Sequence, residues 1–308
     1  MTATPAHSRP LHDALFHYTC EFDALGLLTS FHQADQTPEP GIIRNFLGTR
    51  IEPLVYPPVL TARAGIVEGL PIPGNWHADI AEWAGALRSV ALAAERGQET
   101  YRIIEAGCGW GCWITNMGVA ARARGLGVDL IGIEGDAYHL ASAAKTLALN
   151  GFSPDQFALH HGVAGPRPGK AIFPVHDKDG TNWGAEPVFY PDAPTLAKAT
   201  GRKDVQILDC RTLTDLGRGQ PVDLLHIDIQ GAEVDFVTGN FDAITAHVKR
   251  VLIGTHSRII EGQLCAHFLG HGWRLEMDRP VLAPLVDGRP VTQIDGVHLW
   301  ANPRFEPA

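Results

Sequence analysis

The chain has 308 residues, 45 % of them apolar and 19 % charged, so it can bury a sizeable core in one large domain with an appendage or at most in two domains. Its net charge of −9 argues against nucleic acid as the main partner, because binding phosphate requires a basic face. The five scattered cysteines contain no CxxC pair, which supports neither a disulfide framework nor a zinc knuckle and favours reduced thiols.

Residues 1–74 are predicted to form an irregular N-terminal extension or lid that packs on the main domain. Prolines cluster between residues 38 and 73 and disfavour long helices there, while residues 12–30 are compatible with a short helix. The first ten residues lack the apolar run of a signal peptide, and no stretch of about 18 apolar residues occurs anywhere. We therefore expect a cytoplasmic protein without a membrane span, and the extension is either a substrate lid or an arm of a homo-oligomer.

Residues 75–308 are predicted to form the main domain, in which strands and helices alternate. Apolar spacing predicts a helix that begins near Asn75 and stops at Gly97. The elements expected next are strand 101–106, helix 112–124, strand 129–134, helix 137–150 and strand 156–163. A stretch rich in Gly, Pro and Asp follows at 165–220, with short strands near 171–174 and 206–210.

The alternation returns near the C-terminal third of the chain. The predicted elements are strand 222–228, helix 233–239, strand 248–255, helix 259–269 and a closing pair of strands at 273–277 and 297–301. Strands that alternate with helices indicate an α/β domain, whose sheet is mostly parallel with helices on both faces.

A glycine-rich loop follows the first strand of this domain. Glu105, Gly107, Gly109 and Gly111 occupy every second position, and glycine lets the backbone turn sharply and approach a ligand closely. The helix that follows has free N–H groups at its start. Glu134 ends the next strand, where a carboxylate can accept hydrogen bonds from both hydroxyls of a ribose. The pattern indicates a nucleoside cofactor.

Two cofactors compete for this loop. A dinucleotide site is typically G-x-G-x-x-G, with the pyrophosphate at the helix N-terminus, whereas here Trp110 and Trp113 crowd the loop. S-adenosylmethionine needs no pyrophosphate cradle, and a carboxylate at Glu105 suits its cationic amino-acid end. We therefore favour S-adenosylmethionine over NAD, with a glycine-rich turn that binds nothing as the third interpretation.

The segment Val222–Glu233 resembles the FkbM family of methyltransferases, which carries a strand ending in Asp followed by Gly, Ala and Glu. The resemblance continues in Arg250–Ser257 and Thr212–Leu216, and Pro73–Asp79 looks like the lead-in helix of a subgroup. It covers roughly residues 65 to 278. It implies a class I methyltransferase fold, with a Rossmann-like, mostly parallel sheet and an antiparallel last strand, S-adenosylmethionine as donor and an oxygen acceptor. Glu105 in place of the commoner Asp is a mild departure, and Gln230 replaces a frequent Glu.

Two candidate catalytic residues end neighbouring strands. In open α/β sheets, ligands lie beyond the carboxyl ends of the strands, where Asp228 and His256 are expected to meet beside the cofactor. His256 is a candidate general base, because the pKa of histidine lies near neutrality, and Asp228 orients it or is itself the base. The structural alternatives are a histidine that ties two loops together and an aspartate that caps the next helix.

The region around these strand ends permits two further interpretations, a metal site and a contact with the substrate. Glu233 begins the next helix, where it either complements the helix dipole or contacts the substrate. Together with Asp228 and His256 it offers mixed oxygen and nitrogen ligands for a divalent cation. The spacing has no specific metal signature, so a metal is not expected.

Four more residues are assigned by position. Val163, after the third strand, is placed near the adenine edge, and His77 is placed at the methionine end or the acceptor. Asn182 and Trp183 lie in the irregular stretch, where an aromatic ring beside small residues can stack on a sugar or can pin the loop to the body. We treat His77, Asn182, Trp183 and Glu233 as candidate substrate-binding residues.

The function that follows from these features is S-adenosylmethionine-dependent O-methylation of a hydroxyl on a sugar, glycolipid or natural-product small molecule. The alternatives are an N-methyltransferase, an NAD-dependent oxidoreductase and a non-catalytic binding protein on the same fold. The oxidoreductase is disfavoured because none of the five tyrosines has a lysine four residues later.

Overall fold

A large mostly parallel sheet forms the centre of the computed structural model, which describes residues 18–175 and 183–306. Within these residues the sheet has eight strands in the order β1-β13-β16-β12-β11-β4-β5-β6. They are β1 (Thr19–Cys20), β4 (Thr100–Ala106), β5 (Gly127–Glu134), β6 (Phe157–His161), β11 (Leu224–Ile227), β12 (Arg250–Thr255), β13 (Arg274–Arg279) and β16 (Gly296–Ala301).

The strand directions confirm the predicted fold class. Strands β12, β11, β4, β5 and β6 pair in parallel, whereas β16 is antiparallel to both β12 and β13. This is the α/β arrangement with an antiparallel last strand that the resemblance to class I methyltransferases implies. The β4, β5, β11 and β12 strands are largely buried on both faces, as expected for the centre of a parallel sheet.

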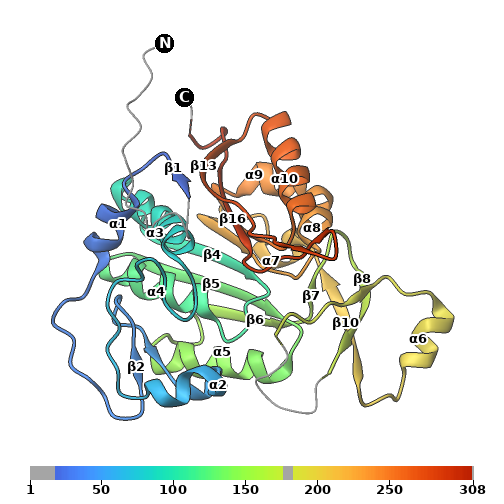
Figure 1. The fold of residues 1–308 in the computed structure, drawn as a ribbon, viewed down its shortest axis with the longest axis horizontal. Helices are drawn as coiled ribbons and strands as arrows, with labels where there is room; N and C mark the ends of the chain where they lie inside the picture. The colour runs from blue at the N-terminus through green and yellow to red at the C-terminus, as the bar shows by residue number, and fades with distance from the viewer. Residues whose placement is uncertain (1–17, 176–182, 307–308) are drawn as a thin grey trace.

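Helices cover both faces of this sheet (Figure 1). One face is covered by α1 (Ala24–Phe31), α3 (Ile80–Glu95), α4 (Cys112–Ala123) and α5 (Ala137–Leu149). The other is covered by α7 (Leu213–Gly217), α8 (Glu233–Gly239), α9 (Phe241–His247) and α10 (Arg258–Gly270). Each side has its own apolar core, with Leu87 and Trp113 buried on the first and Phe236 and Phe268 on the second.

The lead-in helix starts later than the apolar spacing predicts. Its N-cap is Asp79, whose carboxylate accepts a hydrogen bond from the backbone N–H of Glu82 at 3.1 Å. Asn75 instead closes a turn, because its side-chain oxygen accepts from the N–H groups of His77 and Ala78. Helix α3 therefore begins at Ile80, and the turn before it is free to line a cavity.

The N-terminal segment joins the main domain at several points. Strand β1 extends the sheet by pairing antiparallel with β13, and α1 packs in the same core as α3. Between α1 and α3 lie only short elements in the chain, as expected from the clustered prolines. They are β2 (Ile43–Arg44), β3 (Arg50–Ile51), η2 (Pro53–Val55), α2 (Pro57–Leu60) and η3 (Thr61–Arg63). The helix expected at 12–30 is confined to α1, and residues 12–17 lie outside the described part.

The predicted strand 156–163 divides between two sheets. Strand β6 ends at His161, and β7 begins a second sheet of order β7-β10-β8-β9 within the described residues. Its elements are β7 (Val163–Ala164), β8 (Gly169–Pro174), β9 (Val188–Phe189), α6 (Ala193–Ala199) and β10 (Val205–Arg211). Figure 1 shows this insertion extending beyond the main sheet, beside the ends of β4 to β6 (yellow). A small hairpin, β14 (Leu285–Val286) and β15 (Arg289–Pro290), precedes β16.

Among the described residues, every helix is too short or too polar to cross a bilayer.

Candidate functional site

A cavity of about 670 Å³, partly open to solvent, lies beyond the carboxyl ends of β4, β5 and β11. This is where open α/β sheets bind ligands. The glycine loop, the end of β5, the turn after β6 and the end of β11 form its inner wall. Those wall residues include Gly107, Gly109, Glu134, Gly162, Val163 and Asp228. The second sheet and the chain before β9 form the outer wall through Phe173, Trp183 and Phe189. We call this space the first cavity.

The glycine loop approaches the end of β11 so closely that it excludes a side chain. Gly107 has φ +77°, and a Cβ built there would lie 2.0 Å from the carbonyl oxygen of Asp228. Any other residue would clash with backbone and also adopt a conformation unfavourable to L-residues. Gly109 lines the first cavity, whereas Gly111 is the N-cap of α4 and does not line it.

Glu134 lies in the wall of the first cavity with capacity to bind a ligand. Its Oε2 accepts the backbone N–H of Gly109 and its Oε1 accepts the N–H of Asp136, both at 2.8 Å. A carboxylate has about four acceptor positions, so each oxygen retains one for a hydroxyl. Burial raises the pKa of Glu134 to about 6, although these N–H groups favour the ionised form. The carboxylate is therefore ionised at neutral pH.

Glu105 lies elsewhere than expected for a cofactor ligand. Its two oxygens accept the backbone N–H groups of Trp113 at 3.1 Å and Ile114 at 2.9 Å, in the first turn of α4. The side chain is buried and lines neither cavity, and burial raises its pKa to about 7. Glu105 thus caps the helix behind the loop, a role that also suits an acidic residue.

The insertion contributes an aromatic wall to the first cavity. The Trp183 ring lies 3.2 Å from the position a Cβ on Gly109 would take, and its centroid is 4.2 Å from that of His139. His139 is buried, lines the cavity and has no hydrogen-bond partner at Nε2 among the described residues. No motif identified His139 in the sequence. Asn182, the other candidate here, lies outside the described residues.

Asp228, Glu233 and His256 come together as expected for the tips of neighbouring strands. His256 lies between the two carboxylates, with Nε2 3.2 Å from Asp228 Oδ1 and Nδ1 2.8 Å from Glu233 Oε1. Glu233 is fully buried and also accepts the N–H of Gly231 at 3.0 Å. Glu233 therefore holds the imidazole from behind, while Asp228 faces both cavities.

These carboxylates decide the protonation of His256. Burial alone would lower the pKa of His256, but the hydrogen bonds and charges of Asp228 and Glu233 raise it to about 11. Burial acts to raise the pKa of Asp228, and His256 lowers it below its usual value. An imidazolium at neutral pH has no free lone pair, so this geometry disfavours His256 as the general base, and its catalytic role stays a prediction.

The same arrangement does not form a metal site. Both ring nitrogens of His256 already contact carboxylates, so Asp228 and Glu233 lie on opposite sides of the ring. Across residues 18–175 and 183–306, no group of three or more His, Cys, Asp or Glu side chains is placed to hold a metal ion. The three residues instead form an ion-pair cluster.

A second cavity, of about 880 Å³ including the open solvent at its mouth, lies next to the first and shares Asp228 with it. The turn before α3, the end of β12, the end of β13 and the chain entering β16 surround it. Its polar wall consists of Asn75, His77, Asp79, Glu82, Asp228, His256, Arg279, Gln293 and Asp295. Arg279 and Asp295 follow no motif, and only the tertiary structure brings them here.

His77 reaches the second cavity as a neutral side chain. It lies among the indole rings of Trp76, Trp83, Trp110 and Trp113, with centroid distances between 5.3 and 6.2 Å, and its Nε2 contacts the Sγ of a cysteine in α4. Burial lowers its pKa to about 3. The imidazole of His77 can therefore form hydrogen bonds in the wall of the second cavity, but it brings no charge to it.

Comparisons with known proteins place the chain among methyltransferases. No family model matches it. A curated protein of Jannaschia sp. (strain CCS1) that is named as a methyltransferase is 54 % identical over 276 residues, which span 90 % of this chain and 98 % of that protein.

Solved structures give only remote likenesses. Methyltransferase FkbM from Methylobacillus flagellatus KT is 14 % identical over 73 % of this chain and 55 % of that chain, with a TM-score of 0.44. The N-terminal domain of human METTL16 in complex with SAH is 13 % identical over 79 % of this chain and 78 % of that chain, with a TM-score of 0.39. Neither likeness is close enough to bear on the acceptor.

Proposed function

The chain belongs to the methyltransferase family of its Jannaschia relative, and we propose that this S-adenosylmethionine-dependent enzyme methylates a hydroxyl oxygen of a small molecule. The acceptor class is a sugar, a glycolipid or a natural product. The resemblance of Val222–Glu233 to the FkbM methyltransferases supports this class, and membership of that family is part of the proposal. The net charge of −9 supports a small molecule over nucleic acid.

The observation that carries the proposal is the pair of cavities that meet at Asp228. The first cavity fits the donor: Glu134 retains acceptor positions for a ribose diol, and the glycine loop contributes Gly107 and Gly109 to the same wall. His139 adds a ring nitrogen in the same wall that has no hydrogen-bond partner among residues 18–175 and 183–306. Bound there, S-adenosylmethionine would supply an activated methyl group.

The ion-pair cluster provides the groups that an O-methylation needs on the acceptor side. Asp228 is the carboxylate that faces both cavities, so we assign it the hydroxyl proton of the acceptor. His256 donates to Asp228 and fixes its orientation, and buried Glu233 in turn holds His256. In this scheme Glu233 and His256 are positioning residues rather than direct reactants.

Calorimetric titration tests the donor assignment. Purified protein is titrated with S-adenosylmethionine, with S-adenosylhomocysteine and, in parallel, with NAD. We expect saturable binding of the first two and none of NAD. Glu134→Ala is expected to weaken S-adenosylmethionine at least about tenfold, since two hydrogen bonds to a charged group are lost. The matched control is Glu99→Ala, because Glu99 is exposed and lines neither cavity.

Each result has a definite meaning. Binding of NAD in preference to S-adenosylmethionine would reject the donor, and equal affinity of both variants would reject Glu134 as its ribose ligand. Mass spectrometry of a methylated product, with the methyl position located by NMR, distinguishes oxygen from nitrogen as the acceptor atom. A methyl group on nitrogen would contradict the O-methylation proposed here.

A further inference from the structure

The second cavity contains an excess of negative charge that the donor site does not explain. Four carboxylates line it, those of Asp79, Glu82, Asp228 and Asp295. Among the described residues, only Arg279 and the imidazolium of His256 bring positive charge to the wall, and His77 is neutral at physiological pH. Burial raises the pKa of Asp79, Glu82 and Asp295 above the usual values. With all four carboxylates ionised, the lining charges leave an excess of two negative charges around the second cavity.

The ion pairs within and behind the wall of the second cavity do not remove this excess of negative charge. The Arg279 guanidinium pairs with Asp79, and His226 approaches Glu82 with Nε2 3.3 Å from Oε1. Burial acts to lower the pKa of His226, but the contact with Glu82 raises it, so this pair also balances.

Two acidic groups therefore remain without a full counter-charge. His256 has one positive charge to share between Asp228 and Glu233, and Asp295 forms no ion pair with any described residue. Of the residues that line the cavity, Asp228 follows the end of β11 and Asp295 lies in the chain entering β16.

We propose that the second cavity is the acceptor site and that it selects a hydroxyl compound carrying a protonated amine over one carrying a phosphate. This inference rests on the proposed function and names the acceptor class within it. Excess negative charge in a concave site attracts a cation and repels an anion, and low-dielectric walls strengthen both effects. The hydroxyl would approach Asp228 and the amine would lie toward Asp295.

The methyl transfer that this arrangement serves is balanced without another reactant. The acceptor oxygen forms a bond to the methyl carbon while the carbon–sulfur bond breaks and leaves its electron pair on sulfur. The hydroxyl proton passes to the carboxylate of Asp228. The amine of the acceptor keeps its own proton throughout and serves only recognition.

The competing explanation is that the negative charge serves the donor, which is itself a cation. Asp295 separates the two, because it lines the second cavity and not the first. If the negative charge serves the acceptor, Asp295→Asn leaves the affinity for S-adenosylmethionine unchanged. If the negative charge serves the donor, the same substitution lowers the affinity for S-adenosylmethionine. Asp287→Asn is the control, since Asp287 lies in the turn between β14 and β15 and lines neither cavity.

The probes are D-glucosamine, D-glucose and D-glucose 6-phosphate, which share a ring and differ in charge. Their binding to protein saturated with S-adenosylhomocysteine is followed by ligand-observed NMR at millimolar concentration. We expect glucosamine to bind more tightly than glucose, and glucose 6-phosphate to bind least. Asp295→Asn should weaken glucosamine about threefold to tenfold and leave glucose unchanged, as expected for the loss of one nearby charge.

Several outcomes overturn the inference. They are binding of glucose 6-phosphate as tight as that of glucosamine, no binding of glucosamine, and an Asp295→Asn variant that binds glucosamine like the wild type. Displacement of glucosamine by a mixed-sequence RNA oligonucleotide would instead favour a nucleic-acid acceptor. Failure of S-adenosylhomocysteine to bind would count against the proposed function itself, so the two failures remain distinguishable.

Discussion

His256 illustrates how neighbouring charges set the chemistry of a single side chain. The free imidazole would titrate near neutrality and suits a general base, but the two carboxylates that contact its ring nitrogens hold it as an imidazolium. Glu105 is a similar case, since a carboxylate that suits a cationic ligand is used to cap α4. At the scale of the residue, function depends on partners distant in sequence.

Asp228→Asn is expected to separate catalysis from donor binding. An amide cannot take the acceptor proton, so turnover should fall about 10²- to 10⁴-fold. The affinity for S-adenosylmethionine should change little. Asp235→Asn is the matched control, because Asp235 is exposed in the first turn of the neighbouring helix α8. Steady-state kinetics and calorimetry on both variants check this, and turnover retained in Asp228→Asn would remove Asp228 as the base.

His256 also makes a testable contribution to stability. Its pKa is raised from 6.5 to about 11 in the folded state, so the stabilisation is fully present below pH 6.5 and is lost as the pH rises toward about 11. The difference in unfolding free energy between wild type and His256→Gln should therefore narrow over this range. Urea denaturation at several pH values measures it. A difference that stays constant from pH 6.5 to 11 would show that His256 is not held as an imidazolium.

The glycine loop between β4 and α4 is the element most tightly constrained by its surroundings. Gly107→Ala would place a methyl group against the carbonyl of Asp228, in addition to the cost of a positive φ. Gly272 has a nearly equal φ of +78° but open space around it, so Gly272→Ala isolates the backbone cost of about 1–2 kcal/mol.

Gly107→Ala should therefore lose more than Gly272→Ala in both unfolding free energy and affinity for S-adenosylmethionine. Thermal unfolding and calorimetry measure the two effects. Equal behaviour of the two variants would mean that the loop moves freely away from the end of β11.

The second sheet is the other element that shapes the site. It places Trp183 against Gly109, in the wall of the first cavity, whereas Trp183 was predicted from its sequence context to bind the acceptor or to pin the loop. Trp183→Ala should weaken S-adenosylmethionine binding by roughly two- to twelvefold, because an aromatic contact contributes about 0.5–1.5 kcal/mol beyond its buried area. Trp183→Phe should retain most of the affinity. Titration of both variants decides between a donor role and an acceptor role.

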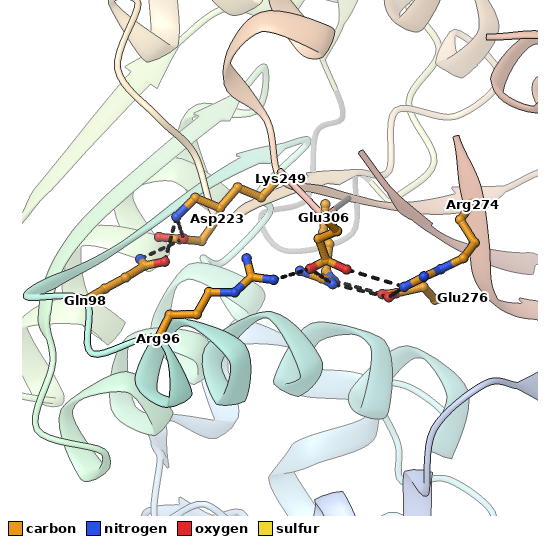
Figure 2. A network of polar contacts seen from close by, with 8 residues as sticks. Arg96, Gln98, Asp223, Lys249, Arg274, Glu276 and Glu306 are labelled. Carbon is orange, nitrogen blue, oxygen red and sulfur yellow. Dashed lines mark hydrogen bonds and ion pairs between the residues drawn. The ribbon is translucent and has the colours of Figure 1, made fainter. Parts of the chain in front are cut away.

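At the scale of the whole molecule, the C-terminal segment is tied to the sheet by charge. Figure 2 shows Glu306 between Arg96, from the end of α3, and Arg274, from β13, beside Glu276. Glu306 also pairs with Arg250, which is buried and bonds Glu276 at 2.8 Å. The network joins the end of helix α3, strands β12 and β13 and the segment after β16.

Glu306→Gln is expected to lower the free energy of unfolding by about 1–3 kcal/mol, because it removes one charged partner from the buried guanidinium group of Arg250. Arg202→Gln is the control, since the Arg202–Asp204 pair is exposed and should contribute less than about 1 kcal/mol. Chemical denaturation compares the two variants. Equal stability would show that the C-terminal network is not coupled to the sheet.

Sequence pattern alone determined much of the architecture from residue 100 onward. The strands and helices around the glycine loop and the meeting of Asp228 with His256 were predictable, because periodicity is a local property and parallel strands place their carboxyl ends at the same edge of the sheet. The antiparallel last strand followed from the family resemblance. Division of the strand at 156–163 between two sheets was not predictable. Gly162 lies where a Cβ would be 2.8 Å from the carbonyl of Asp209, a contact across the fold.

The tertiary structure alone decided the roles within the site. It turned Glu105 into a helix cap, placed Trp183 beside the first cavity, charged His256, and brought Arg279 and Asp295 to the second cavity. The physical reason is that protonation, hydrogen bonding and cavity shape depend on groups that are adjacent in space and far apart in the chain. The sequence shows which side chains the chain contains, and only the packing of the fold determines which of them line the same cavity.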